Sequence, residues 1–121
     1  MSKRILAVDD QEDNRRILRD LLTSAGYEVI EATTGEDAVT LAEAQSPDLI
    51  LMDIQLPGID GYEATRRIKA NARLRPIPLI VVTSYALSGD DAKAFGAGAD
   101  AYVSKPFSPR ALLAKVREYL P

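Results

Sequence analysis

The sequence predicts an α/β protein built on a doubly wound parallel sheet with helices on both faces. Five short apolar runs alternate with five longer segments in which apolar residues recur at helical spacing. Two of the apolar runs, at residues 48–52 and 79–82, are continuous, as expected of strands covered on both faces. The 121 residues contain no internal repeat or linker, so we expect a single domain over residues 1–121.

The expected strands are the short apolar runs, at residues 5–8, 29–32, 49–52, 79–82 and 101–103. The first helix follows the first strand, and its predicted apolar face contains Ile17, Leu18, Leu21, Leu22 and Ala25. Gly26 comes next, where the C-terminus of a helix favours a left-handed residue.

Four further helices are expected at residues 35–45, 60–72, 88–97 and 108–120. The second should stop at Ser46, because the proline at position 47 disfavours a helical conformation in the residue before it. Asp60 and Ser108 precede the third and fifth helices and are predicted to cap them.

The composition excludes several classes of chemistry. Cysteine and histidine are both absent, which rules out disulfides, thiolate or imidazole metal sites and histidine-based catalysis. The net charge of −3 and the pI of about 4.9 are a poor match for nucleic-acid binding. A basic cluster without aromatic residues is more typical of a solvated helix face; it comprises Arg66, Arg67, Lys69, Arg73 and Arg75.

The chain has no signal-peptide pattern, and no apolar run approaches the roughly 20 residues that cross a bilayer. We therefore expect a cytoplasmic protein with no membrane contact and no direct contact with nucleic acid.

Polar residues follow four of the five expected strands, whereas the second strand contributes nothing comparable. In open parallel sheets, ligand sites form at the carboxyl ends of the strands. Three acids, a hydroxyl and a lysine should therefore meet at one edge, namely Asp9, Asp10, Asp53, Thr83 and Lys105.

Three neighbouring carboxylates repel one another unless a cation lies between them. An oxygen-only ligand set suits Mg²⁺, which binds one or two carboxylates and keeps positions for water and phosphate. Lys105 and Thr83 suit the charge on phosphoryl oxygens, and an aspartate can accept phosphate covalently. A single aspartate after a strand is usually a turn former or a cap, but the whole set favours a metal-assisted phosphoryl acceptor at Asp53.

At these residues the chain resembles the receiver domain of bacterial two-component response regulators. The resemblance spans essentially the whole length and rests on four blocks: Val8-Asp9-Asp10, Leu51-Met52-Asp53-Ile54-Gln55-Leu56-Pro57-Gly58-Ile59-Asp60-Gly61, Val82-Thr83-Ser84 and Tyr102-Val103-Ser104-Lys105-Pro106-Phe107. It implies the flavodoxin-like receiver fold, with strand order 2-1-3-4-5 and five helices. Residues 48–57 and Ile77-Pro78 most resemble stand-alone, single-domain receivers of the DivK type.

The resemblance implies that Asp53 takes a phosphoryl group from a phosphohistidine on a sensor histidine kinase or a histidine phosphotransfer protein. Asp10, Asp53 and the backbone carbonyl of Gln55 should bind Mg²⁺, with Mn²⁺ as an alternative ion. Asp9 should act mainly through a metal-bound water.

The same resemblance implies that Lys105 pairs with the phosphoryl oxygens and that the peptide bond before Pro106 is cis. Thr83 should move toward the phosphoryl group and Tyr102 should turn inward, forming the output switch. Without the family match, an aromatic residue in a terminal strand would be read as ordinary packing.

Two positions should set the lifetime of the phosphorylated state. Gln55 and Tyr85 match positions that flank the path of the hydrolytic water in this family, and we hypothesise that they crowd it. The face of the fourth helix, fifth strand and fifth helix should bind a downstream protein; it would include Ala86, Leu87, Tyr102, Val103, Phe107 and Leu112.

The resemblance implies a switch, monomeric or dimerising on phosphorylation, and not a turnover enzyme. A receiver excised from a larger regulator or hybrid kinase, or a degenerate docking module that is not phosphorylated, would look similar. A phosphatase with an aspartate nucleophile is disfavoured, because such enzymes typically carry an acid where Gln55 stands. A flavodoxin-like cofactor binder is disfavoured because the acidic residues 9–13 would repel a phosphate.

Overall fold

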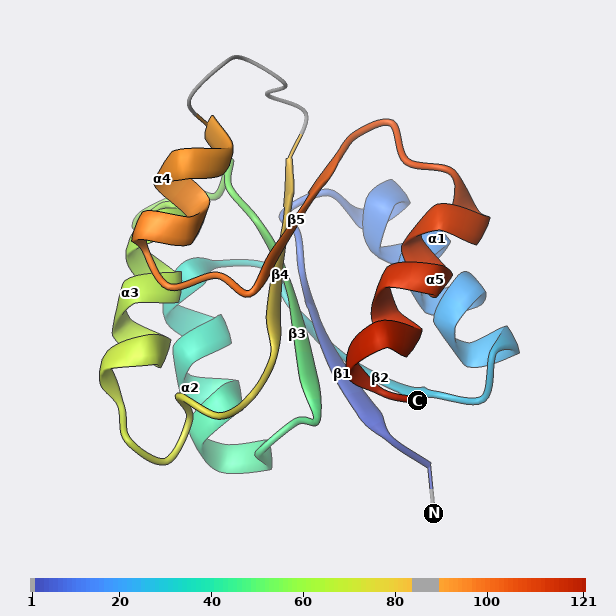
Figure 1. The fold of residues 1–121 in the computed structure, drawn as a ribbon, viewed down its shortest axis with the longest axis horizontal. Coiled ribbons are helices and arrows are strands. Elements are labelled where there is room, and N and C mark those ends of the chain that lie inside the picture. Colours follow the sequence, from blue (N-terminus) through green and yellow to red (C-terminus); the bar gives the residue numbers. More distant parts are fainter. Residues whose placement is uncertain (1, 84–89) are drawn as a thin grey trace.

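A parallel sheet forms the centre of the molecule in the computed structural model, which describes residues 2–83 and 90–121 (Figure 1). Its strands are β1 (Arg4–Val8), β2 (Glu28–Ala32), β3 (Leu49–Asp53), β4 (Leu79–Thr83) and β5 (Ala101–Ser104). They pair in the order β2-β1-β3-β4-β5, and every pair is parallel. The predicted fold class and strand order are confirmed.

Helices cover both faces of this sheet. They are α1 (Glu12–Ser24), α2 (Gly35–Gln45), α3 (Gly61–Ala70), α4 (Asp90–Gly96) and α5 (Pro109–Tyr119). Figure 1 shows α1 and α5 on one side of the sheet and α2, α3 and α4 on the other. The chain passes from one face of the sheet to the other at its two edge strands, β2 and β5. In the resulting strand order, β1 and β3 lie side by side.

Two apolar clusters fill the space between the sheet and its helices. Every residue of β3 and β4 is buried, because alternate side chains point into opposite clusters. Ile68 of α3 lies in the cluster on the α2–α4 side, and Leu22 of α1 and Leu112 of α5 lie in the other. The sheet therefore belongs to both cores at once.

Side-chain caps begin α2, α3 and α5. Asp60 Oδ1 accepts from the Glu63 amide at 2.9 Å, and Ser108 Oγ accepts from the Ala111 amide at 3.0 Å, which confirms both predicted caps. Thr34 caps α2 in the same way, a cap that the sequence reading did not identify. Gly26 has φ +96°, as its position after α1 requires.

Some predicted details were wrong. Ile17 was assigned to the buried face of α1 but is 52% exposed. Ile17 precedes buried Leu18 by one residue, which is a rotation of about 100° around the helix axis. It therefore lies at the margin of the apolar stripe. The third helix ends at Ala70 and not at residue 72, because Asn71 leaves the helix and its side chain accepts from the Arg73 amide at 2.9 Å.

The predicted partner face also needs correction. Leu112 was predicted to belong to this face but is fully buried. It lies on the side of α5 that packs against the sheet. Tyr102, Val103 and Phe107 are partly buried. Ala86 and Leu87 lie outside the described residues.

The basic cluster on and after α3 is tied into local contacts. Glu63 pairs with Arg66 at 3.1 Å and with Arg67 at 3.0 Å. The Lys69 ammonium donates to the carbonyls of Arg75 and Ile77 and pairs with a carboxylate oxygen of Asp100. These contacts support the interpretation of the cluster as part of the helix surface. Among residues 2–83 and 90–121, no helix combines the length and apolarity needed to span a membrane.

Candidate functional site

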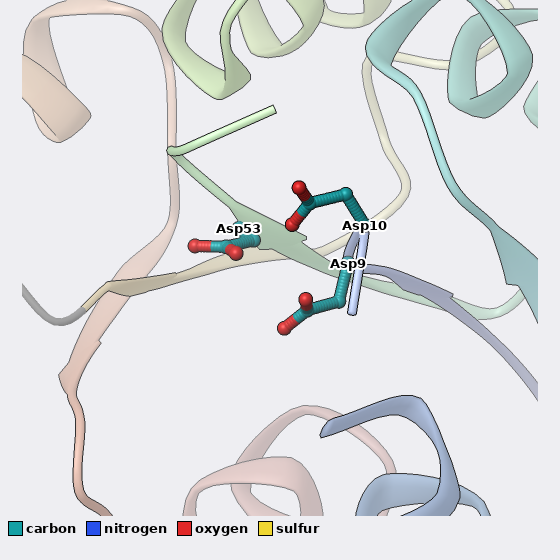
Figure 2. Close-up of side chains that lie close together, drawn as sticks. All are labelled: Asp9, Asp10 and Asp53. Carbon is teal, nitrogen blue, oxygen red and sulfur yellow. The ribbon is translucent and has the colours of Figure 1, made fainter. Parts of the chain in front are cut away.

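Three aspartates meet at the carboxyl edge of the sheet (Figure 2). Asp9 and Asp10 directly follow β1, and Asp53 ends β3. Val8 is paired with Met52 in the β1–β3 register, so the next residues of the two strands emerge side by side. One carboxylate oxygen from each aspartate lies within 4.8 Å of the others. Asp9 and Asp53 are buried, with 1% and 7% exposure, whereas Asp10 is exposed.

Lys105 brings a positive charge to this cluster from the loop after β5. Its ammonium lies 2.9 Å from Asp9 Oδ2 and 3.4 Å from Asp53 Oδ2. Its backbone amide donates to the carbonyl of Thr83 at 2.7 Å, which ties the loop to the end of β4. The Lys105–Pro106 peptide bond is cis, as the resemblance implied.

The buried charges shift two pKa values. Burial raises the pKa of the Asp53 carboxyl; the charge of Lys105 opposes this shift, the charge of Asp9 adds to it, and the net pKa is above its usual range. Burial lowers the pKa of Lys105, but its hydrogen bond to Asp9 and the charges of both acids outweigh burial and raise it. Lys105 is therefore protonated at neutral pH. Its single positive charge does not fully offset the burial of Asp53, whose pKa stays raised.

The backbone holds both buried aspartates in place. Asp9 accepts from the Gln11 amide through Oδ1 at 2.9 Å, and its own amide donates to the Ala32 carbonyl of β2. Asp53 Oδ1 accepts from the Ile54 amide at 2.8 Å. These bonds leave Oδ2 of each residue directed to Lys105.

A polar hollow of about 400 Å³ adjoins the three carboxylates. Its lining residues are Asp10, Gln11, Asn14, Asp53, Gln55 and Lys105. Carboxylate oxygens at this spacing fit a hard divalent cation such as Mg²⁺, which takes oxygen ligands and retains waters. The donor set is thus suited to the predicted ion.

Of the other predicted site residues, one lines this hollow and the others lie elsewhere or outside the described residues. Gln55 is exposed and lines the hollow. Thr83 is fully buried at the end of β4. Tyr102 lies on β5, partly buried against the cluster on the α2–α4 side. Tyr85 and Ser84 lie outside the described residues.

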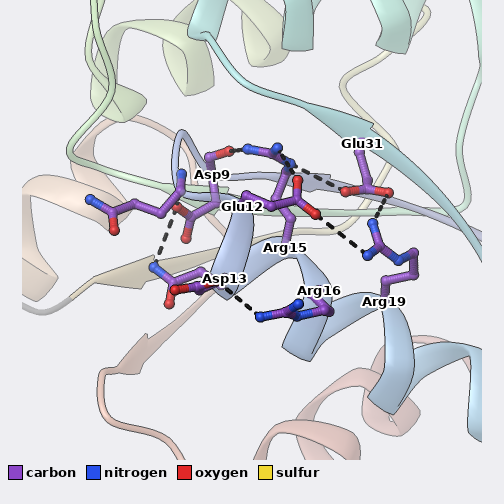
Figure 3. Close-up of polar contacts among 9 residues, drawn as sticks. Asp9, Glu12, Asp13, Arg15, Arg16, Arg19 and Glu31 are labelled. Carbon is purple, nitrogen blue, oxygen red and sulfur yellow. Dashed lines mark hydrogen bonds and ion pairs between the residues drawn. The ribbon is translucent and has the colours of Figure 1, made fainter.

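The sequence reading missed one contribution to the site. The second strand was expected to add no comparable polar residue to the site, and its Glu31 instead pairs with Arg15 and Arg19 of α1. Arg15 in turn donates to the backbone carbonyl of Asp9 at 2.9 Å (Figure 3). The signals in the sequence were weak: an acid, Glu31, within the second strand, and an arginine, Arg15, near the start of the first helix.

A second, mostly apolar hollow of about 520 Å³ lies between α1 and the loop after β5. Exposed Ile17 lines it together with Pro106, Phe107 and Pro109. Asn14 and Lys105 line both hollows, so the apolar one opens beside the charged one.

Comparison with known proteins identifies the family. The family model described as the response regulator receiver domain matches residues 5–117. The chain belongs to the response regulator receiver family. This receiver domain is similar to the polar-differentiation response regulator DivK of Brucella ovis, with 42% identity over 120 residues that cover 99% of this chain and 98% of DivK. The resemblance to DivK-type regulators is therefore confirmed.

Solved structures agree with the family assignment. A response regulator from Chloroflexus aurantiacus has a TM-score of 0.95 and 33% identity, covering 99% of this receiver domain and 98% of that chain. The receiver domain of a sensor histidine kinase from Pseudomonas aeruginosa has a TM-score of 0.92 and 38% identity, with the same coverage. That structure is described with a magnesium ion coordinated in its active-site cleft. Receiver domains act with histidine kinases and downstream targets in two-component systems, and this chain is one of them.

Proposed function

We propose that this receiver accepts a phosphoryl group on Asp53 from the phosphohistidine of a sensor histidine kinase or a histidine phosphotransfer protein. The observation that carries the proposal is the cluster of three carboxylates with Lys105 at the mouth of a polar hollow. Asp53 is the acid in this cluster that ends a central strand, contacts Lys105 and lines the hollow.

In the transfer, a carboxylate oxygen of Asp53 forms a bond to phosphorus as the phosphorus–nitrogen bond of the donor breaks. The imidazole nitrogen keeps the electron pair of that bond. Lys105, already 3.4 Å from Asp53, would pair with a phosphoryl oxygen, and the buried hydroxyl of Thr83 would donate to another. Hydrolysis by water returns the Asp53 carboxylate and releases inorganic phosphate, so the chain is a slow switch and not a turnover enzyme.

Asp10, Asp53 and the Gln55 carbonyl would hold Mg²⁺, with Asp9 acting through a water. The bound ion would supply positive charge to the phosphoryl oxygens. Support comes from the oxygen cluster and from the magnesium described in the Pseudomonas aeruginosa receiver.

The output of the switch is a change in protein binding at α4, β5 and α5, with Thr83 and Tyr102 moving together. Half-exposed Phe95 on α4 and partly buried Tyr102 on β5 give this face apolar contact residues. Gln55 and Tyr85 would slow hydrolysis. We propose that this occurs in the cytoplasm, in a chain that is monomeric or dimerises on phosphorylation.

The test is the intact mass of the protein after incubation with acetyl phosphate, with and without Mg²⁺. We expect a gain of one phosphoryl group that requires the metal and is absent in Asp53→Asn. If the folded wild-type protein gains no phosphoryl group, the chain is a docking module of receiver fold and the phosphoacceptor proposal is wrong.

A further inference from the structure

The peptide that joins Asp9 to Asp10 is held at its carbonyl by a side chain from outside the acidic cluster. Nη1 of Arg15 donates to the Asp9 carbonyl at 2.9 Å (Figure 3). Because a peptide group is planar, this bond orients the whole Asp9–Asp10 linkage, including the start of Asp10.

Asp10 depends on this backbone restraint more than its neighbours do. Asp9 and Asp53 have Lys105 and backbone amides as partners for their carboxylates. Among residues 2–83 and 90–121, the Asp10 carboxylate makes no hydrogen bond or ion pair, and the residue is exposed. Its position is therefore set by the main chain on either side.

Arg15 is itself fixed by two acids from different elements. Nε lies 3.2 Å from Glu31 Oε1 on β2, and Nη2 lies 2.5 Å from Glu12 Oε2 on α1. With Nη1 on the carbonyl, all three nitrogens of the guanidinium are bonded, and the side chain is only 12% exposed. Arg19 completes the group by pairing with Glu31 at 2.8 Å.

Two features separate the Arg15 group from an ordinary surface ion pair, which contributes little to the stability of a protein. Arg15 is nearly buried, and its third bond reaches the backbone of the site. The group of Arg15, Arg19, Glu12 and Glu31 carries no net charge, so its influence on the site is geometric and not a long-range field.

We propose that Arg15, anchored by Glu31 and Glu12, is a positioning residue that orients the Asp9–Asp10 peptide and thereby preorganises Asp10 for a divalent cation. This inference rests on the proposed function, since it assumes that Asp10 is a ligand for Mg²⁺. It assigns to β2 and α1 a role in the site that their sequences alone did not reveal.

The experiment is a titration with MgCl₂, followed by the amide NMR signals of residues around the site. Arg15→Met should weaken Mg²⁺ binding by about tenfold, the low end for losing a residue that orients a metal ligand. Arg15→Lys keeps the charge but lacks the planar three-nitrogen fork, and should weaken binding to a similar degree. Glu31→Gln should shift the affinity in the same direction but less, because Glu12 still holds Arg15.

Arg16→Met is the matched control. Arg16 is the next residue on α1, 60% exposed, and it pairs with Asp13 at 3.0 Å. Its replacement should leave the Mg²⁺ affinity within about twofold of wild type, less than the effect of losing an orienting residue. In metal-free spectra, the Asp10 and Gln11 amide signals should move in Arg15→Met and stay in place in Arg16→Met.

Thermal unfolding in EDTA separates positioning from stability. If Arg15→Met melts earlier but binds Mg²⁺ like the wild type, Arg15 is a structural residue only and the inference is wrong. If Arg15→Met does not fold, Arg15→Lys and Glu31→Gln decide by the same titration, and wild-type affinity in both refutes the inference. Failure of the wild-type protein to bind Mg²⁺ would instead overturn the metal site of the proposed function.

Discussion

Asp9, Asp53 and Lys105 show how burial and charge compete within a few ångströms. Lys105 contacts both acids but supplies one positive charge against two buried carboxylates and the exposed Asp10. Burial disfavours the ionised form of Asp53 in the metal-free protein, the charge of Lys105 offsets this only in part, and the charge of Asp9 adds to it, so the pKa of Asp53 is raised. A bound cation, alone or together with a phosphoryl group, would change the balance of positive and negative charge around Asp53.

The raised pKa of Asp53 predicts a pH-dependent stability. Between the ordinary value of 3.8 and the higher folded-state pKa, the folded chain binds more protons than the unfolded chain. The cost of ionising Asp53 is therefore fully present above the folded-state pKa and fades as the pH falls toward 3.8. Asp53→Asn should raise the melting temperature in EDTA at neutral pH by on the order of 5 °C, the shift that about 1 kcal/mol produces in a domain of this size.

This gain should shrink as the pH is lowered, measured by circular dichroism in a series of buffers. Asp20→Asn, at an exposed position on α1, is the matched control for the loss of a carboxylate charge. A gain from Asp53→Asn that stays constant with pH, or a loss of stability at neutral pH, would contradict the argument from burial.

At the scale of elements, the start of α3 supports the acceptor strand directly. The Gly61 amide donates to the Ile54 carbonyl at 2.9 Å, just past the end of β3. A Cβ added to Gly61 would lie 2.0 Å from the carbonyl oxygen of Asp53, so only glycine allows this approach. Thr65, fully buried, donates from its hydroxyl to the Gly61 carbonyl at 2.7 Å and holds the first turn.

Gly61→Ala should therefore separate α3 from the end of β3. We expect a loss of about 1–3 kcal/mol in the free energy of unfolding, the usual cost of overpacking, measured by urea denaturation. The rate of phosphorylation by acetyl phosphate should also fall, because the Asp53 backbone must move.

Gly96→Ala is the matched comparison, since a Cβ at Gly96 in α4 meets nothing within 4 Å. That variant should be as stable as the wild type or more stable by up to about 1 kcal/mol, because alanine favours helix. Equal effects of the two substitutions would show that the close contact at Gly61 is unimportant.

At the scale of the whole molecule, the two apolar clusters share one sheet. Ile68 of α3 and Leu112 of α5 are fully buried on opposite faces of it. Neither set of helices can leave without exposing strands that the other set also covers. The molecule should therefore unfold as one cooperative unit.

Ile68→Ala and Leu112→Ala should each lower the free energy of unfolding by about 2–5 kcal/mol. In both variants, circular dichroism and the NMR signals of α1 and α3 should report a single urea transition. Leu113→Ala, at the partly buried neighbour of Leu112, should lower the free energy of unfolding by less. Separate transitions for the two faces would disprove the shared-core model.

Much of the architecture could be predicted because its signals are local. Apolar runs marked the strands, helical spacing marked the helices, and Asp60 and Ser108 marked two helix starts that the structure confirms. The same periodicity could not tell that Ile17 would stay exposed, because the width of the covered stripe depends on what packs against it.

The sequence by itself determined the fold class, the family and the set of acids that would meet at the carboxyl edge of the sheet. These depend on residue type and spacing along the chain. Only the tertiary structure decided that Lys105 contacts Asp9 more closely than Asp53, and that Glu31 reaches the site through Arg15. Such contacts join residues far apart in the sequence, and their distances follow from the register of strands and the packing of helices.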